Sequence, residues 1–334
     1  MIVKLSPDGS EILFSTYFGG AEVETANRVK IDLAGNLYVA GETQSTDFPT
    51  VSAFQTSFAG GAFDGYIVKF PPDGSSPIYS TYVGGTGAES VAGLAVDLAG
   101  NAFITGLTDS ADYPTEQPFQ PALGGFEDVF VTKLGADGTA LAFSTYLGGG
   151  DNELAPGIDV DFFGNVYVAG RTASRDFPTV NAFQPTLKGF DAFVTKMRSD
   201  GQALEYSTFL GGSGADQALE VSVDLFGHAR VIGQTRSADF PTAQPLQRAY
   251  GGGTSDAFIA TLPPQGDALP FSTYLGGTGS EEGRAIAAAG WGAIFAAGTT
   301  TSPDFPVKAA LQEQYSGFFN DNFLIKIIPG DPSR

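Results

Sequence analysis

The sequence predicts an all-β fold, a β-propeller of four-stranded antiparallel blades. A Ser-Thr-aromatic-x-Gly-Gly motif recurs five times at intervals of 63 to 65 residues, and an Asp-aromatic-Pro motif keeps step with it. The 334 residues include 45 Gly and 20 Pro, a composition typical of short strands and tight turns. Self-similarity at a fixed period indicates stacked or radial repeats. The first motif begins at Ser15, Ser80, Ser144, Ser207 and Ser272.

Each repeat contains four apolar runs that predict strands. In one unit, residues 93–96 lead into the turn 97–101, whose Asp and Gly favour a tight reversal, and residues 102–107 form the second strand. Residues 128–134 form the third strand and residues 141–147 the fourth, with an Asp-Gly hairpin signal between them. Three of the four junctions are short, so the strands should form an antiparallel meander, the blade of a propeller.

Blade packing favours a propeller over a sandwich or a solenoid. A four-stranded meander cannot bury both faces alone, and radial packing of successive blades solves this without long free edges. The second strand is apolar on both faces, which is typical of a strand between neighbouring sheets. A period of about 64 residues also fits propeller blades better than the one-strand coils of a β-helix.

The two ends of the sequence predict how the ring closes. The chain opens on a third strand at residues 2–5 and a fourth at 12–17, and it ends with a third strand at 323–328. Residues 12–17 can therefore complete the last blade, which gives five blades in a single domain over residues 1–334. Either 2–5 or 323–328 supplies that blade's third strand, and an open arc of a larger propeller is the alternative. The expected units are 21–85, 86–149, 150–212, 213–277, and 278–328 together with 1–20.

The repeat resembles a known family. Units such as STYLGG, VDFFGNVYVAGRTASRDFPTVNAFQPT and DAFVTKM are similar to the SBBP type of bacterial β-propeller repeat, over essentially the whole chain. The resemblance implies a propeller in an exported or surface-attached bacterial protein, often within a larger multidomain chain. It implies no general enzymatic activity. Because the first residues fall inside a repeat, we expect the chain to be a slice of a longer product or to start at an internal Met, in either case with room for an export signal upstream.

Composition excludes several classes of partner and chemistry. The net charge of −20 makes this an acidic protein that disfavours nucleic acid and anionic lipid as partners. With no cysteine, the chain can form no disulfide, thiolate zinc site or Cys nucleophile. No apolar run approaches the length of a membrane span, so we expect no membrane insertion. We expect a monomer or one part of a larger multidomain chain.

A long connection between the second and third strands repeats in every unit and is the first candidate for a ligand-binding surface. Residues 44–65 exceed an ordinary hairpin loop, and the Pro that follows the Asp-aromatic pair predicts a short helical turn. The aromatic residue, such as Phe48, can instead plug a groove between blades while the Asp caps a turn. The candidate ligand-binding carboxylates of these loops are Asp47, Asp112, Asp176, Asp239 and Asp304.

A second set of acids follows each Gly-Gly pair by four residues. Placed between one blade and the next, they could ring the mouth of the channel and bind a ligand. Ca²⁺ is a possible occupant because hard cations take carboxylate oxygens. The alternative is that each acid accepts hydrogen bonds from neighbouring turn N–H groups. The set consists of Glu24, Glu89, Glu153, Asp216 and Glu281.

Catalytic signals are weak. The lone histidine, His228, occupies the turn position that Asn holds in other units, and Trp291 stands in a divergent turn of the fifth unit. We therefore assign no catalytic residue and no cofactor. The sequence predicts a non-enzymatic binding or adhesion scaffold, secreted or at the cell surface, whose long-loop face contacts a glycan or protein ligand. The alternative is a propeller hydrolase or lyase that uses carboxylates at the channel mouth.

Overall fold

The computed structural model confirms the all-β prediction. It describes residues 1–289, 292–317 and 319–328, and within these ranges the chain forms strands and turns but no helix, hence none that could span a membrane. The chain divides into two compact units. The first comprises Met1–Gly148 with Asp200–Gln202, and the second comprises Gly149–Ser199 and the described residues after Gln202. The boundary at residue 148 lies one residue from the end of the predicted unit 86–149.

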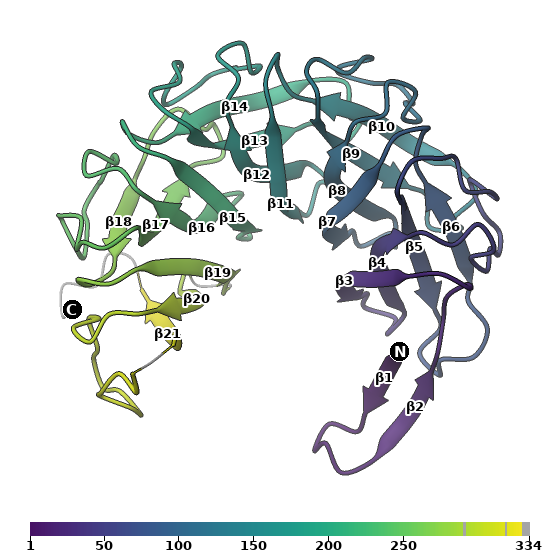
Figure 1. Cartoon of the computed structure of the whole chain (residues 1–334), viewed down its shortest axis with the longest axis horizontal. Coiled ribbons are helices and arrows are strands. Elements are labelled where there is room, and N and C mark those ends of the chain that lie inside the picture. The colour runs from purple at the N-terminus through teal and green to yellow at the C-terminus, as the bar shows by residue number, and fades with distance from the viewer. Residues whose placement is uncertain (290–291, 318, 329–334) are drawn as a thin grey trace. The chain divides into compact units, whose positions relative to one another are not determined.

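The first unit contains a two-stranded sheet and two complete blades (Figure 1). Within each blade the strands pair antiparallel in chain order, as the meander predicts. The strands are β1 (Ile2–Leu5), β2 (Ile12–Thr16), β3 (Glu24–Ile31), β4 (Leu37–Thr43), β5 (Asp64–Phe70), β6 (Tyr79–Val83), β7 (Glu89–Val96), β8 (Ala102–Thr108), β9 (Asp128–Leu134) and β10 (Leu141–Leu147).

The second unit contains two complete blades and a three-stranded sheet. The pairing is again antiparallel and sequential. The strands are β11 (Glu153–Val160), β12 (Val166–Thr172), β13 (Asp191–Met197), β14 (Leu204–Leu210), β15 (Asp216–Val223), β16 (Ala229–Thr235), β17 (Asp256–Leu262), β18 (Phe271–Leu275), β19 (Glu281–Ala288), β20 (Ile294–Thr300) and β21 (Asp321–Ile327).

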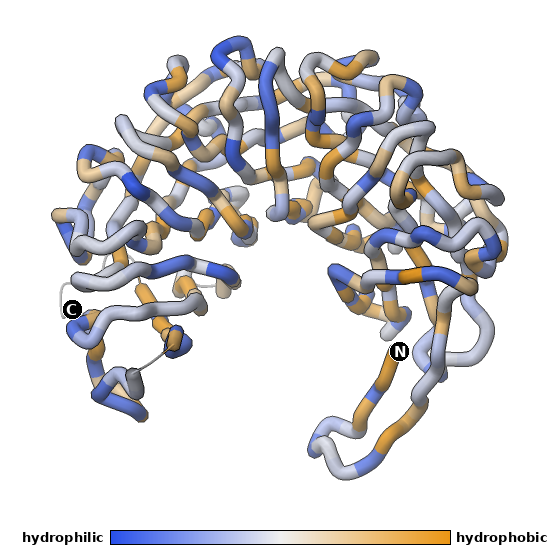
Figure 2. The backbone as a smooth tube through the Cα atoms, viewed as in Figure 1, coloured by the Kyte–Doolittle hydropathy of each residue, from blue (hydrophilic) through white to orange (hydrophobic). Residues whose placement is uncertain are grey.

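The sheets at the two ends of the chain differ from the five blades that the sequence predicts. β2 pairs with β1 in a sheet of its own, and β21 is the last strand of its sheet, so the described chain forms six sheets and a closed ring is not shown. Figure 2 shows hydrophobic residues along both strands of the β1–β2 hairpin. Several are exposed, including Ile12 at 66% and Leu13 at 52%.

The core of each unit lies between neighbouring sheets. Every residue of the third strands β5, β13 and β17 is buried. The second strands β8, β12 and β16, which the sequence predicts to be apolar on both faces, are buried at every position but one. One cluster of the first unit joins side chains of two successive blades, among them Tyr38 and Phe130. The packing of one blade on the next therefore provides the core that a single meander lacks.

The long connections run along the outer edges of the blades. Val51 and Gln55 form β-bridges with Ser80 and Tyr82, and equivalent bridges recur along β10, β14 and β18. The predicted short helical turn is therefore wrong: the segment after Pro49 forms no helical turn, and it bonds to the fourth strand at Val51 and Gln55 with a positive φ of 43° at Ser52 between them. This backbone pairing covers an edge that would otherwise expose unpaired N–H and C=O groups.

Candidate functional site

The turn between the first and second strands of each blade has one repeated geometry. In the turn 32–36, the Asp32 Oδ1 atom accepts hydrogen bonds from the backbone N–H groups of Ala34 (3.0 Å) and Asn36 (2.9 Å). The Asn36 side chain donates to Asp32 Oδ2 at 2.8 Å, and Gly35 adopts a φ of 84°, which favours glycine. Because the Asp binds the backbone of its own turn, the two residues between Asp and Gly are directed to solvent.

The first of these two positions carries Leu or Phe in four successive turns, and the second also carries Phe in the last two. A single exposed apolar side chain is ordinary, but its recurrence at one turn position is not explained by core packing. We call this set the turn-tip residues. In the first unit they are Leu33 and Leu98, and in the second unit Phe162, Phe163, Leu225 and Phe226, exposed by 63% to 90%.

Tyrosine hydroxyls join consecutive turns within each unit. The Tyr38 hydroxyl lies 3.0 Å from Asp32 Oδ2 and 2.9 Å from the backbone oxygen of Gly100, which belongs to the next turn. In the second unit the Tyr167 hydroxyl lies 3.2 Å from Asp161 Oδ2 and 3.3 Å from the oxygen of Gly227. The turn-tip residues of neighbouring blades are therefore held at a fixed spacing rather than carried on mobile loops.

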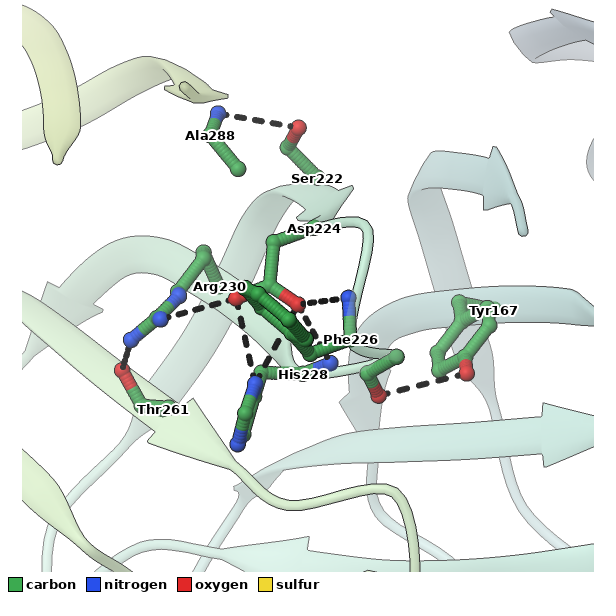
Figure 3. Close-up of polar contacts among 9 residues, drawn as sticks. Tyr167, Ser222, Asp224, Phe226, His228, Arg230, Thr261 and Ala288 are labelled. Atoms are coloured by element: carbon green, nitrogen blue, oxygen red, sulfur yellow. Dashed lines mark hydrogen bonds and ion pairs between the residues drawn. The ribbon is translucent and has the colours of Figure 1, made fainter. Parts of the chain in front are cut away.

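His228 occupies one of these turns, as the sequence predicts (Figure 3). Its Nδ1 atom lies 3.1 Å from Asp224 Oδ2, which also accepts a hydrogen bond from the Arg230 guanidinium at 2.9 Å. Burial opposes ionisation of Asp224, but hydrogen bonds from the His228 backbone and from Arg230 outweigh it and keep its pKa below the usual value. The contacts of His228 and Arg230 with Asp224 thus hold this turn, as the Asn side chain does in other repeats.

The acids that follow Gly-Gly are the first residues of the first strands, and four of the five are buried. Glu89 is fully buried: Oε2 accepts the Gly85 N–H at 3.0 Å, and Oε1 accepts the hydroxyls of Thr108, at 2.7 Å, and Ser110. The half-buried Glu24 keeps the two hydroxyl bonds. Glu153, Asp216 and Glu281 repeat the full pattern or most of it.

The carboxylates of the Asp-aromatic-Pro motif contact the chain segment that links two blades. Asp112 Oδ1 accepts the Thr86 N–H at 2.9 Å, and this bond keeps the Asp112 pKa below its usual value. The aromatic residue that follows, such as Phe48 or Tyr113, is buried. Equivalent bonds are made by Asp47, Asp176, Asp239 and Asp304.

Both sets of predicted site residues thus have hydrogen-bond partners within the protein in every repeat. Their role in ligand binding stays a prediction. The structure places no third His, Cys, Asp or Glu beside any two of them in the described ranges, so no metal-sized cluster forms there. The turn-tip residues are not among the site residues predicted from the sequence. The sequence does show large apolar residues, such as Phe162 and Phe163, between the Asp and the Gly-Asn of these turns. Trp291, the divergent turn residue of the fifth unit, lies outside the described residues.

A family model matches the chain in three places. The model of the SBBP beta-propeller repeat covers residues 13–49, 78–114 and 142–178. The chain carries SBBP beta-propeller repeats. Each match begins at or near the fourth strand of one blade and ends at the Asp-aromatic-Pro motif of the next, so the SBBP repeat crosses the junction between blades. The buried acid and its hydrogen bonds lie inside the matched segment.

Similarity to solved structures is weak, and no curated protein matches. A protein of unknown function from Dyadobacter fermentans is 15% identical, with 84% of this chain and 77% of that chain covered and a TM-score of 0.46. The NanB sialidase of Streptococcus pneumoniae is 8% identical, with 84% and 53% covered and a TM-score of 0.44. The gluconolactonase XC5397 of Xanthomonas campestris is 11% identical, with 84% and 82% covered and a TM-score of 0.34. At these values the similarity assigns no activity to this chain.

Proposed function

We propose that this chain is a non-enzymatic binding scaffold of an exported bacterial protein, and that it binds a protein partner through its turn-tip residues. The observation that carries this proposal is the recurrence of exposed Leu and Phe on tyrosine-bridged turns. Exposed apolar groups on a rigid support lose little conformational entropy on binding, which favours a stable interface. Aromatic side chains, which Phe162 and Phe163 provide here, are enriched at the centres of protein interfaces.

The chemistry of the turns supports a protein rather than a glycan. Sugars need polar groups beside an aromatic platform, but the carboxylates Asp161 and Asp224 are engaged by their own turns. Leucine, which occupies the turn tips of the first unit, offers no flat aromatic face for stacking. The long-loop face, expected from the sequence, is the second candidate surface. Its recurrent polar groups are bonded within the protein, which leaves them less free to recognise a ligand.

The double variant Phe162→Ser/Phe163→Ser tests the surface. These side chains are 72% and 79% exposed, so the substitutions should leave folding intact. Binding to immobilised candidate surface proteins should weaken about tenfold or more, since interface aromatics commonly contribute over 1 kcal/mol each. The readout is the equilibrium dissociation constant by surface plasmon resonance, with a glycan array in parallel.

Phe126→Ser is the matched control because Phe126 is 82% exposed in a long loop. It should bind like the unmodified protein. If Phe126→Ser abolished binding and the turn-tip variant did not, the binding surface would be the long-loop face. Binding to glycans alone would contradict the choice of a protein partner, and binding to neither array would contradict the scaffold function.

We further propose that the chain closes into five blades through β2. The sequence Leu324-Ile325-Lys326 of β21 resembles Ile2-Val3-Lys4 of β1, which pairs with β2 in the register Ile2 to Thr16. In complete blades the tyrosine of the fourth strand, such as Tyr82, is 1% exposed, whereas Tyr17 is 87% exposed. Burial of Tyr17 in the last blade would remove this difference, and β21 would then take the place of β1 beside β2.

A cysteine pair tests this closure in a chain that has no cysteine of its own. By the repeat, Thr16 should face Leu324 as Thr273 faces Ile259 in the blade β15–β18. The variant Thr16→Cys/Leu324→Cys should therefore form a disulfide within one chain on mild oxidation. Deletion of residues 1–17 should lower the melting temperature. An unchanged melting temperature together with free thiols would favour the open arc, and a disulfide between two chains would indicate strand exchange.

A further inference from the structure

Two pairs of buried carboxyl groups lie at junctions between successive blades. Asp64, the first residue of β5, faces Glu89, the first residue of β7 in the next blade. Asp256 at the start of β17 and Glu281 at the start of β19 repeat this arrangement in the second unit. All four side chains are at most 1% exposed. Neither pair belongs to the turn-tip surface.

The glycine between the two carboxyls shows how close their oxygens come. A Cβ atom on Gly84 would lie 2.5 Å from Glu89 Oε2 and 3.0 Å from Asp64 Oδ1. A Cβ atom on Gly276 would lie 2.5 Å from Glu281 Oε2 and 2.7 Å from Asp256 Oδ1. One oxygen from each carboxyl therefore faces the same small space, which a side chain larger than hydrogen would occupy.

The hydrogen bonds of each pair leave one oxygen without a donor. Asp64 Oδ2 accepts from Gln55 Nε2 at 3.1 Å and from the Ala59 N–H at 2.8 Å. Glu89 accepts from the Gly85 N–H and two hydroxyls. Asp64 Oδ1 and Asp256 Oδ1 are buried and have no partner among the described residues. The donors around both pairs are neutral amides and hydroxyls, and no ion pair joins them in the described chain.

Two adjacent buried anions without a cationic partner are strongly disfavoured, and the simplest compensation is one proton per pair. We propose that each pair holds one proton at mildly acidic pH, in a hydrogen bond between the unpartnered Asp oxygen and the facing Glu Oε2. The two junctions then lose stability as the pH rises and the proton leaves. The pair titrates as a unit, so the proton belongs to both groups.

The electrostatic surroundings agree with this geometry. Burial raises the pKa of Asp64 to about 6, and the charge of Glu89 adds to the effect against the hydrogen bond from Ala59. Burial likewise raises the pKa of Asp256 to about 6, with Glu281 adding to it. The other titratable groups that face these carboxyls are one acid, Asp109, and tyrosines whose pKa values burial raises further above neutrality. These tyrosines are Tyr82, Tyr113, Tyr146, Tyr250 and Tyr274.

A proton fits the space better than a metal ion. Ca²⁺ takes six to eight oxygen ligands. Here two carboxyls meet, the described residues form no group of three acids that could hold a metal ion, and the remaining oxygens already accept N–H and O–H donors. The pair Asp191–Asp216 differs in its hydrogen bonds, although burial raises the pKa of Asp191 in the same direction. Both carboxyls face Gly211, but Asp191 Oδ1 accepts the Gly189 N–H at 3.1 Å and so is not left without a donor.

The variant Asp64→Asn/Asp256→Asn tests the proposal, because Asn keeps the size of Asp and always donates a hydrogen bond. In the unmodified protein the folded pKa of about 6 exceeds the unfolded value of about 3.9. This contribution to stability is therefore full below the unfolded pKa and is lost as the pH rises through about 6. The melting temperature should fall between pH 5 and pH 8, and the fall should be several degrees smaller in the variant.

Asp267→Asn, at an exposed carboxyl, is the control and should keep the pH profile of the unmodified protein. The infrared band of protonated carboxyl groups at pH 5 provides a second measurement, and it should be weaker in the double variant than in the unmodified protein. An equal band in the two proteins, or an unchanged pH profile in the double variant, would overturn the proposal. Calcium chloride that raised the melting temperature at pH 8 in the unmodified protein but not in the variant would also overturn it, in favour of a cation site.

Discussion

Gly106→Ala is expected to lower the free energy of unfolding by about 3 kcal/mol or more. Gly106 lies in β8 opposite a β-bulge in β7, where the register shifts between Val91 and Gly93. The bulge directs the Ser90 carbonyl oxygen at Gly106, so an added Cβ would clash with backbone. Backbone on both paired strands would have to move, which costs far more than the rotation of a side chain.

Gly135→Ala is the matched control for this substitution. Gly135 is not in the left-handed region, and the nearest atom to an added Cβ there, the Ala140 oxygen, lies 3.4 Å away. This variant should be as stable as the unmodified protein or slightly more stable, since Ala restricts the unfolded chain. Urea unfolding followed by circular dichroism measures both. Equal stability of the two variants would show that β7 relaxes around the new methyl group.

Gly106 also shows why the fold could be predicted from the sequence. Strand positions follow from runs of β-branched and aromatic residues, and these runs appear at every period of the repeat. Gly106 and the bulge beside it recur with that period, so local and global preferences agree. The short helical turn after Pro49 was wrong because proline suits an extended edge segment as well as the first turn of a helix. Pairing with β6 decided between the two, and tertiary pairing is invisible in a local pattern.

The candidate site was less predictable, because the function of a carboxylate depends on its partners. Glu89 was expected at a channel mouth, yet its oxygens are occupied by Thr108, Ser110 and Gly85. Nothing in the sequence marks these three residues as hydrogen-bond donors to Glu89, because only the fold brings them together. The exposure of Phe162 likewise depends on the Asp161 turn, which directs the residue away from any core. The repeat indicates that the positions of Glu89 and Phe162 recur, but it does not predict which groups surround these side chains.

Glu89→Ala is expected to destabilise the protein by about 3 to 5 kcal/mol. The substitution removes the acceptor of two hydroxyls and one N–H, all buried, and each unsatisfied donor costs about 1 to 3 kcal/mol. Because Ser110 and Gly85 lie on either side of the blade junction, the loss should also loosen the link between successive blades. Amide hydrogen exchange should report faster opening at Gly85 and along β7.

Glu24→Ala separates this effect from the simple loss of an acid. Glu24 holds the same position in β3 and bonds Thr43 and Ser45, but it is only half-buried, so water can replace the lost acceptor. Its substitution should cost about 1 kcal/mol. Glu89→Gln should fall between the two, because the amide keeps an acceptor for the hydroxyls and turns a donor toward the Gly85 N–H. Equal losses of unfolding free energy for Glu24→Ala and Glu89→Ala would mean that burial of the acid contributes nothing to the stability of the blade junction.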